Sequence, residues 1–165
     1  MRRFPVVVCL VFSLVVDEQS ASAQSVWRRF IEPNFGTSVD LPTSIFSVPN
    51  GASYRGIGSQ FKTKDGRSAL AIYSQSNERD ETPAVYLKKN FRMQRAALDY
   101  ERITSSFFAI SAVEKGLIFY SRCNFSHRNG GAIHCFDLKY PNSEKRAWDS
   151  IVTRISRSLR PLDGS

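Results

Sequence analysis

Three successive segments in the second half of the chain carry apolar residues at both odd and even positions. They are Ser105–Val113, Leu117–Cys123 and Ala132–Tyr140. Successive side chains of a strand point to opposite faces of its sheet, so a strand that is apolar at both parities is typical of a sheet covered on both faces. Short turns at 114–116 and 128–131 separate the segments, which favours antiparallel neighbours.

Two predicted helices supply the covering layers. The first is expected to start at Thr82, a candidate N-cap followed by proline, and to run to about Ala97. The second is expected to begin near residue 142 or 143 and to end before Pro161. Its apolar residues recur at helical spacing along one face. They are Trp148, Ile151, Val152, Ile155 and Leu159.

The first half of the chain predicts further strands. Segments 26–30 and 35–42 are strand candidates, Asn50-Gly51 predicts a turn, and Asp65-Gly66 lies between the runs 56–63 and 68–75, which is a hairpin signal. With 165 residues the chain is long enough for one domain. The fold class that fits is α+β, an antiparallel sheet flanked by helices on both faces.

The N-terminal segment has the pattern of a secretory signal peptide. Arg2 and Arg3 precede an uncharged, mostly apolar run of 13 residues at 4–16, and Ala21-Ser22-Ala23 is a small-residue cleavage site. A membrane span needs about 20 apolar residues, so a retained anchor is the weaker alternative. We expect a signal peptide over 1–23, a single domain over 24–165, and a periplasmic or secreted protein with no transmembrane anchor after cleavage.

Export changes how the cysteines are interpreted. Cys123 and Cys135 remain after cleavage, 12 positions apart and on either side of a predicted hairpin, so we predict a disulfide between them. A zinc site would add His127 and His134 to the two thiolates, and a Cys/His nucleophile pair is the other alternative. Adjacent strand residues point to opposite faces and an oxidised cysteine is no nucleophile, so we predict no metal, no cofactor and no catalytic cysteine.

Positive charge is the one global indication of function. The formal net charge is +8 and the pI about 9.7, and basic side chains follow one face of each predicted helix. They are Lys88, Arg92 and Arg95 on the first helix and Arg146, Arg154, Arg157 and Arg160 at the second. Such a field attracts anionic partners, although a solvated helix face that keeps the protein soluble is the simpler explanation. Export and the lack of a recognised motif argue against nucleic acid.

Three stretches resemble a known family. The first joins Trp27 to PNFGTSVDLP at 33–42, the second is DGRSALAIY at 65–73, and the third runs from FFAIS at 107–111 through GLIFY at 116–120 to the final helix and Arg160-Pro161. Together they resemble small exported proteins of Gram-negative bacteria with a PsbP-like α/β/α sandwich. Domains of that kind are mostly accessory or binding modules, so the resemblance implies a non-enzymatic role. It carries over no site residues.

The sequence contains no Gly-x-Ser-x-Gly elbow and no paired acids at a catalytic spacing. We therefore expect a non-enzymatic exported binding or accessory module that acts through contacts with an unknown envelope protein or an anionic surface. The alternative is an envelope hydrolase with a site around His127 and His134, which would need one of these imidazoles in a pocket near a carboxylate or hydroxyl.

Overall fold

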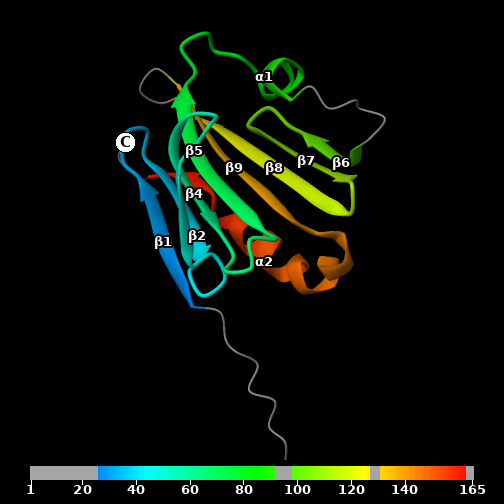
Figure 1. Cartoon of the computed structure of the whole chain (residues 1–165). Helices are drawn as coiled ribbons and strands as arrows, with labels where there is room; N and C mark the ends of the chain where they lie inside the picture. Colours follow the sequence, from blue (N-terminus) through cyan, green and yellow to red (C-terminus); the bar gives the residue numbers. More distant parts are fainter. Residues whose placement is uncertain (1–25, 92–97, 127–130, 163–165) are drawn as a thin grey trace, which may run out of the picture.

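The computed structural model describes residues 26–91, 98–126 and 131–162 (Figure 1). Several predictions lie outside these residues: the signal peptide over 1–23, the roles of Arg92, Arg95 and His127, the last part of the first predicted helix at 92–97, and most of the turn predicted at 128–131.

The largest element of the described chain is a seven-stranded sheet in which every neighbouring pair is antiparallel. The order across the sheet is β3-β4-β5-β9-β8-β7-β6. The long strands β5, β8 and β9 lie at the centre, where the sequence is apolar on both faces. The strands are β3 Val48–Ala52, β4 Ile57–Lys62, β5 Ala69–Ser76, β6 Leu98–Ile103, β7 Phe107–Glu114, β8 Leu117–Ser126 and β9 Ala132–Pro141.

A second, three-stranded sheet lies beside the main one. Strands β1 (Trp27–Glu32), β2 (Thr37–Pro42) and β10 (Arg160–Pro161) pair in the order β1-β2-β10, both pairs antiparallel. The sequence predicted the first two strands but assigned all strands to one sheet. The separate sheet is a correction, and it arises because β2 packs against the C-terminal helix through Val39 and Leu41.

Two α-helices cover opposite faces of the main sheet (Figure 1). Helix α1 (Pro83–Asn90) packs Tyr86 and Leu87 into a cluster with Tyr73, Cys123 and Cys135. Because alternate residues of a strand face opposite ways, the other parity of the same strands faces helix α2 (Lys145–Ser158), which follows a 3-10 turn over Asn142–Glu144. The α2 cluster contains Ile72, Phe136 and Leu138 from the sheet and Trp148, Val152 and Ile155 from the helix.

The predicted hairpins are confirmed. Strands β4 and β5 pair around Asp65-Gly66, where Gly66 has φ +70°. Strands β7 and β8 pair around Lys115-Gly116, with φ +52° and +77°, the pair of positive values that the favoured two-residue turn requires.

Two predictions about local structure are wrong in detail, and one edge strand was not predicted. Asn50-Gly51 was predicted as a turn but lies within β3, where the register shifts and Gly51 has φ +84°, so it forms a bulge in the strand. Helix α1 ends at Asn90 and not near Ala97, because Phe91 leaves helical geometry and its side chain is buried in the α1 cluster. Strand β6 was not predicted, since four of its six residues are exposed.

Candidate functional site

The outer face of helix α2 carries the exposed basic side chains that the sequence predicted. The helix buries Trp148, Val152 and Ile155 against the sheet, so positions on the far side point to solvent. Arg146, Arg157 and, just beyond the helix, Arg160 are exposed, and none has an ion-pair partner among the described residues. The outer face of α2 therefore presents three arginines that form no ion pair with the described residues.

Arg154, the fourth predicted basic residue of this helix, is engaged within the protein. Its Nε lies 3.3 Å from Asp40 Oδ2, and its guanidinium carbon lies 4.2 Å from the centre of the Trp27 ring. The other oxygen of Asp40 accepts from Arg29 Nε at 3.2 Å. Arg154 thus ties α2 to the three-stranded sheet, and Asp40 offsets part of its charge.

Two hollows lie on either side of α2. One, of about 460 Å3, is formed between α2 and strands β6, β7 and β8; we call it the β6–β8 groove. The other, of about 590 Å3, is open and lies toward β2 and β10, where Asp40, Ser158 and Arg160 line it. Asp149, Thr153 and Arg157 line both hollows, so Arg157 stands on the ridge between them.

Helix α1 has fewer exposed, unpaired basic side chains than α2 among the described residues. Lys88 is exposed on α1 and has no ion-pair partner among the described residues, whereas the neighbouring Lys89 pairs with Glu81. Because α1 and α2 cover opposite faces of the sheet, Lys88 and the arginines of α2 do not share one surface.

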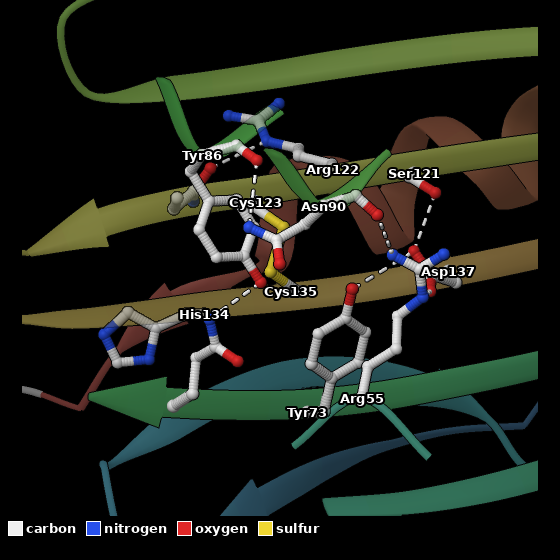
Figure 2. Close-up of a disulfide and its surroundings, with 12 residues drawn as sticks. Arg55, Tyr73, Tyr86, Asn90, Ser121, Arg122, Cys123, His134, Cys135 and Asp137 are labelled. Atoms are coloured by element: carbon white, nitrogen blue, oxygen red, sulfur yellow. Dashed lines mark hydrogen bonds and ion pairs between the residues drawn. A yellow bond between two sulfur atoms is a disulfide. The ribbon is translucent and has the colours of Figure 1, made fainter. Parts of the chain in front are cut away.

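Cys123 and Cys135 form the predicted disulfide, with sulfurs 2.00 Å and Cα atoms 4.1 Å apart. They are direct partners in the ladder between β8 and β9, and both are fully buried. Figure 2 shows the bridge on the α1 face of the sheet, close to Tyr86. Both sulfurs are occupied by this bond, so neither the zinc alternative nor the cysteine nucleophile is supported.

His134 lies in a closed polar network between the two sheets. Its side chain has 0% exposure; Nδ1 lies 2.7 Å from Thr37 Oγ1 of the small sheet, and Nε2 lies 3.3 Å from Ser126 Oγ of β8. Burial lowers the pKa of His134 to about 4, against the opposing effect of the Glu32 charge. The imidazole is therefore neutral at pH 7 and satisfied on both sides, as expected for a packed core histidine.

Glu32 is a second buried member of this region. It is 3% exposed, and its carboxylate accepts hydrogen bonds from Ser74 Oγ, from the amides of Asn34 and from the Phe35 N–H. Burial alone would raise the pKa of Glu32, but these donors outweigh it and lower the pKa below its usual value. Glu32 thus stays ionised and fastens the β1–β2 turn to β5.

A polar cluster that the sequence analysis missed lies on the α1 face. Arg55 Nε is 3.3 Å from Asp137 Oδ2, and the other oxygen of Asp137 accepts from Ser121 at 2.7 Å and from Tyr73 at 3.4 Å. Figure 2 shows Arg55, Tyr73 and Ser121 converging on this carboxylate. Burial raises the pKa of Asp137, partly offset by Ser121 and Arg55.

The sequence contained one signal for this cluster. Asp137 is two positions from Cys135 on the same predicted strand, so it shares a face with the disulfide. Its partner Arg55 lies in the loop before β4 and comes from a distant part of the sequence, and no local pattern pairs the two residues.

Known structures were compared with this architecture. The solution structure of cyanobacterial PsbP (CyanoP) from Synechocystis sp. PCC 6803 matches with a TM-score of 0.62 over 89% of this chain and 99% of that chain, at 10% sequence identity. The chain has a PsbP-like fold. This likeness shows the fold and nothing of the activity, because the identity is low.

A crystal structure from Bacteroides thetaiotaomicron also aligns, with a TM-score of 0.46 and 17% identity, over 82% of this chain and 48% of that one. No protein-family model matches the sequence, and no curated protein matches it. The PsbP-like fold therefore rests on structure, in agreement with the resemblance seen in the sequence.

None of the helices in 26–91, 98–126 and 131–162 is both long and apolar enough to span a bilayer. Within the same ranges, His, Cys, Asp and Glu side chains form no group of three or more that could hold a metal ion.

Proposed function

We propose that this chain is a non-enzymatic, exported binding or accessory module, periplasmic or secreted, that contacts an anionic envelope surface or an acidic protein partner. The observation that carries the proposal is the outer face of α2, where Arg146, Arg157 and Arg160 are exposed with no carboxylate partner among the described residues. Arg154 of the same helix, by contrast, is paired with Asp40, so these three arginines are the part of the basic face that is available to a partner.

The rigid setting of these arginines supports a contact role. Helix α2 is fixed by its apolar face and by the pairing of Arg154 with Asp40, so the backbone positions that carry the outer arginines are fixed. A positive surface of this kind attracts anionic lipid headgroups by about 1 kcal/mol for each arginine or lysine near the bilayer. It also draws acidic proteins by the same long-range field.

The hydrolase alternative has less support. His134 is closed off from solvent, both ring nitrogens have hydroxyl partners, and it does not line either hollow beside α2. His127 lies outside the described residues. We therefore place the binding role first.

The test is sedimentation of the purified protein with vesicles that contain 30% anionic phospholipid, about the level that gives a useful surface potential. Replacing Arg146, Arg157 and Arg160 together by alanine should weaken binding by roughly a hundredfold at low salt. Binding of the unaltered protein should also weaken as salt rises, because exposed charges are screened.

A matched control variant carries three alanines at exposed cations outside α2: Arg79, Lys88 and Lys115. It has the same net charge as the test variant, so it should bind as the unaltered protein does if the position of the charge decides. Equal loss in both variants, or binding that the α2 substitutions leave unchanged at low salt, would remove α2 as the contact surface. Binding of an acidic protein but not of vesicles by the same face would identify the partner class as protein.

A further inference from the structure

Arg122 on β8 is a cation that has no carboxylate ion-pair partner among the described residues. It is half-buried, on the sheet face that α2 covers, and it lines the β6–β8 groove. Its Nε donates to Asn124 Oδ1 at 2.9 Å and its Nη1 to Ser156 Oγ at 3.1 Å. No carboxylate of the described residues forms an ion pair with it. Both contacts are to neutral oxygens, so the charge itself is not compensated.

The guanidinium is held in a fixed position. Its carbon lies 4.3 Å from the centre of the Phe107 ring, and the Ser156 hydroxyl that it contacts is fixed in turn by Tyr120, 3.1 Å away. A guanidinium carries five N–H donors, of which these two hydrogen bonds use two. Arg122 lines the groove, and a planar oxyanion is the group that matches the geometry of guanidinium donors.

A second guanidinium adds positive charge beside Arg122. The carbon of Arg102 lies 5.5 Å from the centre of the same Phe107 ring, and Arg102 and Arg157 also line the groove. Two cations that share one ring repel each other, and removing a charge from water costs free energy unless it is paired. Arg122 is half-buried and Arg102 is exposed, so an anion bound between them would offset their repulsion and the cost of burying the charge of Arg122.

The groove also limits what kind of anion fits. Its volume of about 460 Å3 is that of a small-molecule site. Phe107 and Tyr120 give it aromatic walls, while Asp99 and Asp149 at its lining repel further negative charge. A ligand with one anionic group beside a flat apolar portion satisfies all of these features, whereas a polyanion does not.

We infer that the β6–β8 groove is a binding site for a small molecule that carries a single carboxylate or phosphate group next to an aromatic or other flat apolar portion, with Arg122 as its principal contact and Arg102 as the second. This site goes beyond the proposed envelope contact, because it uses the flank of α2 and not its outer face.

The experiment is a titration of the purified protein with benzoate and with phenyl phosphate, followed by amide NMR shifts. Benzyl alcohol serves as the neutral analogue and inorganic phosphate as the anion without a ring. We expect saturable shifts with benzoate or phenyl phosphate at residues of β7, β8 and the Ser156 side of α2, and much weaker binding of the two controls. Arg122→Gln should weaken binding about tenfold or more, the value of one charge-assisted contact, and Arg102→Gln should weaken it by less.

Arg146→Gln is the matched control, because it removes one arginine of α2 that does not line the groove; it should leave benzoate binding unchanged. Absence of saturable binding, or equal losses from Arg122→Gln and Arg146→Gln, would overturn the site. If Arg122→Gln does not fold, Arg102→Gln is compared with Arg146→Gln. A larger loss of benzoate binding in Arg102→Gln supports the site, and equal losses overturn it.

Vesicles distinguish the source of the anion. If anionic vesicles displace benzoate, the groove takes a lipid headgroup; if they bind without displacing it, the groove takes a free small acid, and either result supports an oxyanion site. The outcome is separable from the proposed function, because Arg146 does not line the groove: Arg146→Gln tests vesicle binding without touching the benzoate site, and a loss of benzoate binding in Arg122→Gln is measured with no vesicle present.

Discussion

At the residue scale, His134 is the side chain whose chemistry the fold changes most. Burial lowers its pKa to about 4, whereas an unfolded chain has a histidine pKa near 6.5. Between these values the unfolded chain binds a proton that the folded chain does not, so the free energy of unfolding falls as the pH drops from about 6.5 to 4. The full effect of this residue is roughly 3 kcal/mol below pH 4.

The matching measurement is urea unfolding at several pH values for the unaltered protein and for His134→Gln, which keeps a polar side chain but does not titrate. The unaltered protein should lose more stability on acidification than the variant. Between pH 6.5 and 4 its free energy of unfolding should fall more steeply with decreasing pH, by the slope that corresponds to one extra proton bound in the unfolded state. Glu32 and Asp137 also titrate, but both are present in the unaltered protein and in the variant, so they contribute to both pH profiles. Parallel pH profiles would show that His134 is not held neutral by the fold.

Asp137 shows what sequence reasoning misses at this scale. The disulfide was predictable because two cysteines in a chain that is expected to be exported have few alternatives. The Arg55–Asp137 pair was not, since it joins a loop residue to a strand 82 positions later and depends on how β4 lies against β5 and β9. In the same way, nothing local in the sequence distinguished Arg154, which pairs with Asp40, from its neighbour Arg157, which does not.

At the element scale, the bridge between β8 and β9 joins the two strands at the centre of the sheet. Closing a loop of this length is worth about 3 kcal/mol in the chain-entropy description. Replacing both Cys123 and Cys135 by alanine should lower the free energy of unfolding by about that amount, measured by urea unfolding. Adding a reductant should destabilise the unaltered protein and leave the variant unaffected; equal responses would mean that no disulfide forms.

Close packing of β4 on β5 depends on Gly58. A Cβ atom at this position would lie 2.0 Å from the Ile72 carbonyl oxygen and 2.7 Å from Tyr73 Cα, so the two backbones must move apart to admit one. Gly58→Ala should therefore destabilise the protein by roughly 1–3 kcal/mol. The control Ser59→Ala, at the next position, should change stability by less than about 0.5 kcal/mol. A neutral Gly58→Ala would contradict the strand spacing.

The elements that could be predicted are those with a strong repeating pattern. Helix α2 and the central strands have apolar residues at the right period over many positions, and the structure confirms them. Strands β3 and β6 lie at the two edges of the main sheet and are largely exposed, so they have no apolar alternation to detect. Their positions are set by pairing with β4 and β7, which is tertiary information.

At the scale of the whole molecule, export is the expectation with the most direct consequence. If residues 1–23 are a signal peptide, protein recovered from the envelope or medium of its host should begin at Gln24. Mass spectrometry of the intact protein gives this directly, and it also reports whether Cys123 and Cys135 have lost two hydrogens. A full-length chain with free thiols in the cytosol would contradict export.

The other whole-molecule property is the separation of charge between two faces. Uncompensated arginines gather on α2, while α1 on the opposite face offers the exposed Lys88 among the described residues. The fold class and the basic side chains were predictable from the sequence; which of them stay unpaired, and that Arg122 and Arg102 meet over Phe107, follows only from the packing of α2 against β6–β8.

The central claim is that the protein works through the α2 face. Amide NMR spectra of the protein with and without anionic bicelles test it at every residue. We predict that the largest line broadening falls on the outer residues of α2 and on Arg160, and that it disappears as salt is raised. Broadening centred on α1 around Lys88, or spectra unchanged by anionic bicelles and by acidic protein alike, would contradict the account.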